Sequence, residues 1–488
     1  MTTDLSRRCF IKTTAAGLLC SGSLAGLTQL LHAATPACAK PASRVRIGRI
    51  YLGRERPGWP MHKVDLAQER QAFDAALAKL GNALDEYEFV DGGIISETAQ
   101  LPEAFSKFSN VDGILAIQLS MGVGGIIQAV LEKQSPMLLF APPYTGHEWH
   151  IVASLQRQGK LIESYPTSKV EDLPAALRPI RAIHRLKEAR ILHISTGPAD
   201  PNYCSALNKK FGTEIISLKL EDLKAAYQKA DRGEAMADAR KWIREAGRIV
   251  EPTRQEIENA SLMFIAMRDM LAEHGAVAVT MNCLGMRLMD VGMAYPCLGF
   301  VRLNNMGLGG VCEADIKSTM THLIFSKLVG VPGFVTDPVF DLSNSTIIHA
   351  HCVAATQMEG PASKPAKYHI RSHLEDGRGV SLMVKMPVNR KLSMARLIGT
   401  DIMLFSTGQA VDSPFVDRGC RTKLTMKVDH IEKFLEGWSS GLHRVVFYGD
   451  HERDIRRYCR FAQIRLLHEG VDDLHNVEGL EWEPRVHA

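Results

Sequence analysis

Short apolar runs alternate with amphipathic stretches from Arg44 to about Pro143, and this pattern constrains the fold more than any other feature of the sequence. Residues 45–52 are predicted to form a strand, and Asp65 is predicted to cap the helix that follows it. Two further apolar runs, 111–119 and 136–141, are predicted to be buried strands. Strands that alternate with helices in this way are typical of β-α-β units built around a mostly parallel sheet.

A second block of the same texture runs from about Ala189 to Phe340, with long helical stretches predicted over 221–250 and 252–274. After Asn344 the texture changes to closely spaced strand-like runs with few helical periods. The sequence therefore predicts an α/β fold. It consists of two Rossmann-like α/β domains with parallel sheets, followed by a β-rich C-terminal domain, over residues 40–170, 171–344 and 345–488.

The N-terminus has the order of regions expected of a secretory signal. A polar stretch, Ser6-Arg-Arg-Cys-Phe-Ile-Lys12, precedes a weakly apolar run and the ending Ala37-Cys-Ala39. The paired arginines resemble the twin-arginine export signal, so residues 1–39 are predicted to be removed and the protein to reach the periplasm or another extracytoplasmic space. Lipidation of Cys38 is the alternative. No later run offers about 18 uninterrupted apolar residues, so no membrane span is expected after signal removal.

Net charge and cysteine content indicate which binding partners and which disulfides can be expected. The formal net charge of +4 is small for 488 residues and no block of like charges stands out, so nucleic acid is not an expected partner. Three of the ten cysteines lie in the predicted signal, and the remaining seven cannot all pair with one another. Because no C-x-x-C motif occurs and most of the seven lie in apolar contexts, we expect buried free thiols rather than a disulfide framework.

Two acidic residues lie where the second block approaches the third. Glu313 is predicted at the start of a helix, and Asp337 at the end of a strand over 333–335. Ends of parallel strands and starts of the following helices face one crevice of an open sheet, so the two carboxylates are expected to converge. Such a pair can hold a divalent cation or exchange a proton. Capping and turn roles are the ordinary alternatives for both residues.

The surrounding residues resemble a known family. The segments are Cys297-Leu-Gly-Phe-Val-Arg-Leu-Asn-Asn-Met-Gly-Leu-Gly-Gly-Val-Cys-Glu-Ala-Asp-Ile316, Leu328-Val-Gly-Val-Pro332 and Thr336-Asp-Pro338, and they are similar to the second domain of the L-fucose isomerase and L-arabinose isomerase superfamily. The resemblance implies that Glu313 and Asp337 bind a divalent metal, usually manganese. His443, which precedes an aromatic run ending in Tyr448-Gly-Asp450, matches the family's third ligand. The resemblance also implies a homo-oligomer.

Further side chains are candidates for the same site. His349 and His351 are predicted to point to one face of a strand. In the arabinose branch a histidine shortly after the second carboxylate belongs to the metal site, so the resemblance makes His351 an additional ligand or a substrate contact. Asn304 is a candidate substrate contact. The chain departs from the fucose branch at Asn305 and Leu442, which replace polar groups expected to face a polyol, so the identity of the sugar stays open.

The resemblance implies a metal-dependent aldose–ketose isomerase that binds Mn²⁺ or another divalent cation. It would act on an open-chain sugar through a cis-enediol intermediate, with Glu313 and Asp337 moving a proton between C1 and C2. Two alternatives stay open. One is an exported metal-dependent enzyme of the same fold that acts on glycosides or modified sugars by hydrolysis, elimination or epimerisation. The other is a non-catalytic sugar-binding protein. In each case the expected partner is a small-molecule sugar or glycoside.

Overall fold

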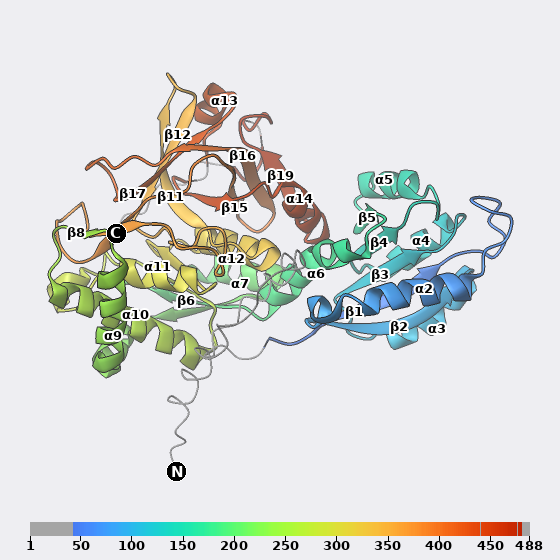
Figure 1. The fold of residues 1–488 in the computed structure, drawn as a ribbon, viewed down its shortest axis with the longest axis horizontal. Helices are drawn as coiled ribbons and strands as arrows, with labels where there is room; N and C mark the ends of the chain where they lie inside the picture. The colour runs from blue at the N-terminus through green and yellow to red at the C-terminus, as the bar shows by residue number, and fades with distance from the viewer. Residues whose placement is uncertain (1–41, 440, 476, 481–488) are drawn as a thin grey trace, which may run out of the picture.

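The computed structural model describes residues 42–480 apart from 440 and 476, so the predicted signal peptide lies outside the described residues. Three large sheets follow one another along the chain. In Figure 1 the first sheet lies to the right, and the third lies above the second on the left. The structure is thus a mixed α/β fold with a β-rich C-terminal region, as the sequence predicts at this level.

The first sheet has five parallel strands in the order β2-β1-β3-β4-β5. Its strands are β1 (Val45–Leu52), β2 (Tyr87–Ile95), β3 (Gly113–Gln118), β4 (Met137–Ala141) and β5 (Ile162–Pro166). The helices between them are α2 (Leu66–Ala78), α3 (Leu101–Lys107), α4 (Gly124–Val130) and α5 (Trp149–Arg157). Asp65 caps α2 as predicted, because its carboxylate accepts hydrogen bonds from the N–H groups of Ala67 and Gln68.

The second sheet is also parallel and has the order β10-β9-β6-β7. Its strands are β6 (Arg190–Ile194), β7 (Glu214–Leu218), β9 (Ala278–Met281) and β10 (Gly309–Cys312). Helices α6 (Leu173–Lys187), α7 (Pro201–Phe211), α10 (Arg254–His274), α11 (Cys297–Asn305) and α12 (Ile316–Val329) accompany them. Figure 1 shows α6 bridging the gap between the first sheet and the rest of the molecule.

The helix predicted over 221–250 is interrupted, so this prediction was wrong in its extent. The segment contains α8 (Leu220–Lys229), α9 (Arg232–Glu245) and the short strand β8 (Arg248–Ile249). Ala230 takes an extended backbone with ψ of 143°, and Asp231 then caps α9. The apolar periodicity continues across this break, whereas only the capping aspartate marks it.

The third sheet closes into a barrel. Its order is β15-β18-β11-β12-β17-β16-β19, and β15 also pairs along its whole length with β16, which joins the two ends of a six-stranded ring. The strands are β11 (Phe334–Asp341), β12 (Thr346–His351), β15 (Arg390–Ile398), β16 (Ile402–Asp412), β17 (Thr422–Lys427), β18 (Arg444–Tyr448) and β19 (Arg465–His468). Two further strands, β13 (Tyr368–Arg371) and β14 (Ser381–Val384), form a small sheet with β8. The helices here are α13 (Ile431–Glu436) and α14 (Glu452–Phe461).

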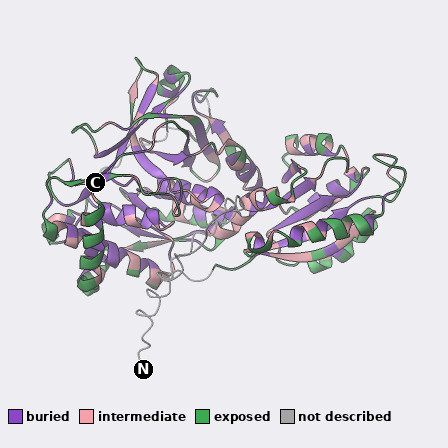
Figure 2. Cartoon of the chain, viewed as in Figure 1, coloured by how far each residue is buried: buried purple, intermediate pink, exposed green. Residues whose placement is uncertain are grey.

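The second sheet and the barrel share one hydrophobic core. Buried side chains from β6, β9, α10 and α11 belong to the same cluster as those from β12, β17 and β18. Figure 2 shows the buried residues concentrated in the strands and in the helices between them, with exposed residues on the outer helices. The junction of sheet and barrel is therefore fixed by packing. Among the helices of residues 42–480 that the structure describes, none is long and apolar enough to cross a membrane.

Candidate metal centre

Four of the residues selected from the sequence lie together at this junction. Glu313, Asp337, His351 and His443 each place one nitrogen or oxygen atom within 4.8 Å of the others. The Nε2 atom of His443 lies 3.4 Å from a carboxylate oxygen of Glu313 and 3.3 Å from one of Asp337. The Nε2 atom of His351 lies 3.9 Å and 4.0 Å from the other oxygens of the same two carboxylates.

The register of the barrel brings three of these side chains together. In the antiparallel pair β11–β18, Thr336 lies opposite Arg444, so Asp337 and His443 occupy the next position along the pair. On the other side of β11, Asp337 lies opposite Ala350, the neighbour of His351 at the end of β12. The three side chains thus come from β11, from the end of β12 and from the residue directly before β18, and these three strands are adjacent in the barrel.

The structural position of Asp337 differs from the predicted one. Asp337 was expected at the end of a strand of a parallel sheet, whereas it lies inside β11, which continues through Pro338 to Asp341. The strand tolerates the proline because the pairing between β11 and β18 stops at Thr336, before a proline N–H would be required on that side. An Asp-Pro pair usually indicates a turn, and the barrel register overrides that preference here.

Glu313 reaches the site from the second sheet. It lies in the turn between β10 and α12, where Glu313 and Ala314 both have left-handed backbones with φ of 60° and 53°. Asp315 follows as the N-cap of α12. A left-handed conformation of a residue other than glycine costs on the order of 1 kcal/mol or more, and such residues gather at functional sites. The turn projects Glu313 towards the barrel rather than along the helix.

Asp315 orients His443. Its Oδ2 atom lies 2.9 Å from Nδ1 of His443 and 3.1 Å from Nη1 of Arg396. The same carboxylate accepts hydrogen bonds from the N–H and the hydroxyl of Ser318 at 3.0 and 2.7 Å. A carboxylate that accepts from Nδ1–H leaves Nε2 as the atom that faces the cluster, which is the arrangement found behind histidine ligands of metals. This role of Asp315 cannot be recognised from the sequence, because the residue has the pattern of an ordinary N-cap.

The charges of these groups are strongly coupled. Burial alone would raise the pKa of Asp315, but the charges and hydrogen bonds of Arg396 and His443 outweigh it and hold that pKa well below its usual value. Burial alone would lower the pKa of His443, but Asp315, Asp337 and Glu313 raise it well above the ordinary value. The neighbouring His443 ring lowers the pKa of Glu313. The cluster therefore has the negative charge that attracts a cation.

His351 differs from His443 in how its ring is held. The N–H of Cys352 donates to Nδ1 of His351 at 2.8 Å. Because Nδ1 accepts, the proton of a neutral ring lies on Nε2, and it points towards Glu313 and Asp337. This tautomer suits His351 to donate a hydrogen bond to an oxygen atom. It does not suit His351 to ligate a metal through Nε2.

The cluster fits a divalent cation. Nε2 of His443 and Nε2 of His351 are buried and make no hydrogen bond within the described part of the chain, since their contacts with the carboxylates lack hydrogen-bond geometry. A buried polar atom without a partner costs about 1–3 kcal/mol. Two carboxylates and one imidazole are donors that Mn²⁺ and similar ions accept, and Glu313 remains 39% exposed on the open side. The residues could thus hold a divalent metal.

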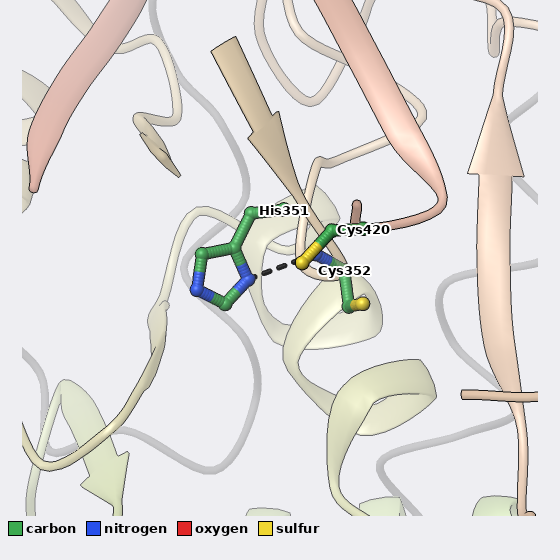
Figure 3. Close-up of side chains that lie close together, drawn as sticks. All are labelled: His351, Cys352 and Cys420. Atoms are coloured by element: carbon green, nitrogen blue, oxygen red, sulfur yellow. Dashed lines mark hydrogen bonds between the residues drawn. The ribbon is translucent and has the colours of Figure 1, made fainter. Parts of the chain in front are cut away.

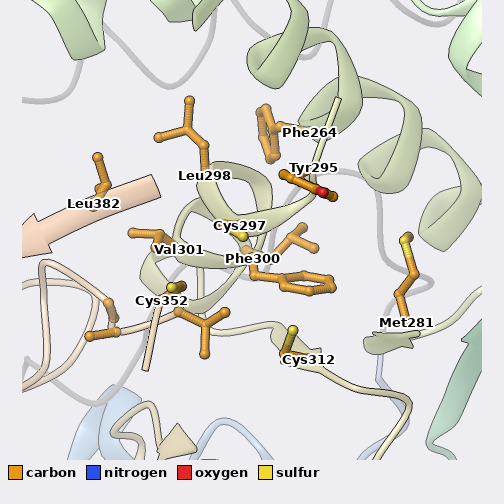
Figure 4. Packing of buried hydrophobic residues seen from close by; sticks show 14 of the residues in the cluster. Phe264, Met281, Tyr295, Cys297, Leu298, Phe300, Val301, Cys312, Cys352 and Leu382 are labelled. Carbon is orange, nitrogen blue, oxygen red and sulfur yellow. The ribbon is translucent and has the colours of Figure 1, made fainter. Parts of the chain in front are cut away.

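The side chain of Asn304 is hydrogen-bonded to backbone groups. It is buried, and its amide donates to the carbonyl oxygens of Gly310 and Val353 while its oxygen accepts from the N–H of Gly310. Figure 4 shows the packing around α11, whose Phe300 belongs to the same buried cluster as Cys312 of β10. The amide of Asn304 therefore fastens α11 to β10, directly before the Glu313 turn, and the sugar contact expected of it is not supported by its position.

The other polar residues near the motif also have structural partners. Asn305 is hydrogen-bonded to Thr356, and Arg302 forms an ion pair with Asp238 at 3.0 Å. The Nδ1 atom of His349 lies 2.9 Å from the hydroxyl oxygen of Thr336, and burial lowers the pKa of His349 to about 3. Of the two histidines predicted to share a face of the strand, only His351 enters the cluster.

Comparisons with known proteins give a distant match to a sugar isomerase. No protein-family model matches the chain. Over 301 residues, which are 58% of this chain, the sequence is 24% identical to sulfoquinovose isomerase of Clostridium sp. (strain MSTE9). The aligned part covers 65% of that protein, slightly less than two thirds of its length. The chain is therefore distantly similar to a protein named as a sugar isomerase, and it carries a Glu/Asp/His cluster able to hold a divalent metal.

Proposed function

We propose that this chain is a metal-dependent aldose–ketose isomerase acting on an open-chain sugar, with Glu313, Asp337 and His443 as ligands of the cation. The observation that carries the proposal is the orientation of His443. Asp315 holds its Nδ1 atom, and its Nε2 atom faces both carboxylates without a hydrogen-bond partner. The distant similarity to a sugar isomerase supports the reaction class.

In this proposal the cation, the two carboxylates and His351 have separate roles. A divalent cation, for which we propose Mn²⁺, polarises the sugar's carbonyl and adjacent hydroxyl when bound. Glu313, whose pKa is lowered by the neighbouring His443 ring, is ionised at neutral pH and can accept the proton from carbon. Asp337 is the partner carboxyl that exchanges the proton on the other side of the C1–C2 bond. The Nε2–H of His351 donates to a sugar oxygen and stabilises its developing negative charge.

Sulfoquinovose, the sugar in the relative's name, is the first substrate to test. A panel of aldoses and glycosides should accompany it, with and without Mn²⁺. Isomerisation by proton transfer incorporates solvent deuterium at the carbon next to the carbonyl, so turnover in D₂O followed by NMR identifies the reaction. Activity on glycosides alone would favour a hydrolase or lyase on the same fold, and binding without turnover would favour a sugar-binding protein.

The Glu313→Gln variant tests the site. It keeps the size of the side chain but removes the charge, so turnover and stoichiometric metal should both be lost. Glu359→Gln is the matched control, because Glu359 lies on the surface in an ion pair with Arg390. Retained turnover in Glu313→Gln, or metal-independent turnover in the unaltered protein, would reject the assignment. Export by the predicted signal and assembly into a homo-oligomer are further parts of the proposal, and each needs its own test.

A further inference from the structure

A second group of metal-binding atoms lies behind His351. The Nδ1 atom of His351 and the Sγ atoms of Cys352 and Cys420 lie within 4.8 Å of one another. Figure 3 shows the imidazole beside both thiols, with the hydrogen bond from the Cys352 N–H to the ring drawn as a dashed line. His351 and Cys352 are buried, and Cys420 is partly exposed, which leaves a path for an ion to enter.

The barrel holds these three residues in place. Strands β12 and β17 are antiparallel neighbours with His351 opposite Thr422. Cys352 directly follows β12, and Cys420 lies shortly before β17, so both thiols come from the same end of this strand pair. The ammonium group of Lys423 donates to the carbonyl oxygens of Cys420 and Val416, at 2.5 and 2.8 Å, and ties down the loop that carries Cys420.

The chemistry of this group is unlike that of the carboxylate cluster. Two thiols and one imidazole are soft or borderline ligands, which favour Zn²⁺ or Cu⁺ over Mn²⁺ or Mg²⁺. His373, which is buried, influences the thiol of Cys352 but lies outside this group of three. Structural zinc sites are commonly tetrahedral with cysteine and histidine ligands.

The remaining close thiols provide a contrast. The Sγ atoms of Cys283 and Cys312 lie 3.6 Å apart in the core. Within the described residues, no third histidine, cysteine or carboxylate joins that pair into a group of three. Buried thiols without further ligands behave as small apolar side chains. The cluster of His351, Cys352 and Cys420 is therefore set apart by its nitrogen donor and by its route to solvent.

We propose that His351, Cys352 and Cys420 form a second metal site, which takes Zn²⁺ and lies back to back with the carboxylate site. Binding would release one proton from each thiol, so the two thiolates neutralise the ion. The ion would replace the Cys352 N–H as the partner of Nδ1. Because Nδ1 would remain without a proton, Nε2–H would still face Glu313 and Asp337. The zinc would thus hold the ring of His351 in the orientation that the proposed isomerase site uses.

Cobalt is a spectroscopic probe for this proposal, since thiolate ligands give Co²⁺ an intense near-ultraviolet charge-transfer band that carboxylates do not. The full chain, stripped of metal and with its thiols reduced, should develop this band with one equivalent of Co²⁺ per chain. Cys420→Ser should abolish it. Cys204→Ser is the matched control, because Cys204 is a partly exposed thiol in α7 outside both clusters, and it should keep the full band.

The same titration separates this proposal from the proposed function. Glu313→Gln should lose manganese and turnover but keep the cobalt band, whereas Cys420→Ser should keep stoichiometric manganese. Circular dichroism would verify that each variant is folded. An unchanged band in Cys420→Ser would overturn the second site. The absence of any band in the reduced, folded protein would also overturn it. This includes the outcome that the purified protein has a Cys352–Cys420 disulfide and binds no Co²⁺ after that disulfide is reduced.

Discussion

Oδ2 of Asp315 lies 2.9 Å from Nδ1 of His443 and joins the start of α12 to the first residue before β18. The contact connects two parts of the fold, since α12 follows the second sheet and β18 belongs to the barrel. It also decides which nitrogen of His443 faces Glu313 and Asp337. The N-cap residue of α12 thereby determines which ring nitrogen of His443 is free to act at the cluster.

The substitution Asp315→Asn tests this contact. Asparagine is as good an N-cap as aspartate, so α12 should persist, although loss of the charge beside buried Arg396 should lower the free energy of unfolding by about 3–5 kcal/mol. Loss of the carboxylate should weaken Mn²⁺ binding by roughly 10–100-fold, because the partner behind a histidine ligand contributes about that much to affinity. Isothermal titration calorimetry measures the effect. Asp290→Asn, at a surface aspartate paired with Arg378, should leave the affinity unchanged, and equal affinity in both variants would contradict the prediction.

Metal affinity should fall as the pH falls. The carboxylates raise the pKa of His443 well above its ordinary value, so the metal-free site holds a proton on Nε2 at neutral pH. That protonation stabilises the metal-free fold fully below a pH of about 6.5, and the stabilisation is lost as the pH rises through the raised pKa. A cation must displace the proton, so its binding should release about one proton per ion. Calorimetry in buffers of different ionisation enthalpy gives this number, and zero release would contradict the prediction.

The two histidines should respond differently to substitution. His443→Ala should remove stoichiometric manganese along with turnover. His351→Ala should retain manganese at the carboxylate cluster and lower kcat by roughly 100-fold, the loss typical of one donor to a developing oxyanion. His351→Gln keeps an N–H donor and should recover part of the rate. Metal analysis together with steady-state kinetics distinguishes the cases, and loss of manganese in His351→Ala would show that His351 is a ligand after all.

Close packing at β10 should make Gly310 sensitive to substitution. A Cβ atom added there would lie 2.6 Å from the Cα of Phe300 and 2.8 Å from its carbonyl oxygen, so backbone would have to move. Gly310→Ala should lower the free energy of unfolding by about 1–3 kcal/mol. Gly125→Ala is the control, since an added Cβ there meets nothing within 4 Å and the helix α4 gains a better helix former. Urea denaturation of both variants provides the comparison.

The predicted export signal can be tested by exchanging its arginine pair for lysine. If residues 1–39 form a twin-arginine signal, the double substitution of Arg7 and Arg8 should leave the precursor, with its signal attached, inside the cell. Cell fractionation followed by mass spectrometry of the N-terminus measures both location and cleavage. Export of the doubly substituted chain at the normal rate would count against this type of signal.

Local signals in the sequence predicted individual elements well. The strand predicted over 45–52 is β1 with the same bounds, and Asp65 caps the next helix as expected. The closure of the barrel was not predicted, because it depends on β15 pairing with both β16 and β18. The alternation of apolar and polar residues indicates which face of a strand is buried, but it does not indicate which strand lies beside it.

The same limit applies to the site. Glu313, Asp337, His351 and His443 were identified from motifs, and the structure brings all four together. The contribution of Asp315 depends on the distance between α12 and the barrel, and the tautomer of His351 depends on the backbone of Cys352. Both are properties of tertiary structure. Asn304 was selected because it is polar and near the motif, whereas its amide is committed to backbone groups.

The backbone of the turn at Glu313 and Ala314 affects how much conformational entropy the chain would lose when a ligand binds. Glycine would adopt these left-handed backbones more readily than alanine or glutamate, yet it would also let the turn visit many other shapes. With side chains at both positions, few alternative shapes are open to the turn once Asp315 is fixed. If the proposed site binds a cation, the carboxylate of Glu313 is already restricted to few orientations, and little further ordering of the chain should accompany binding.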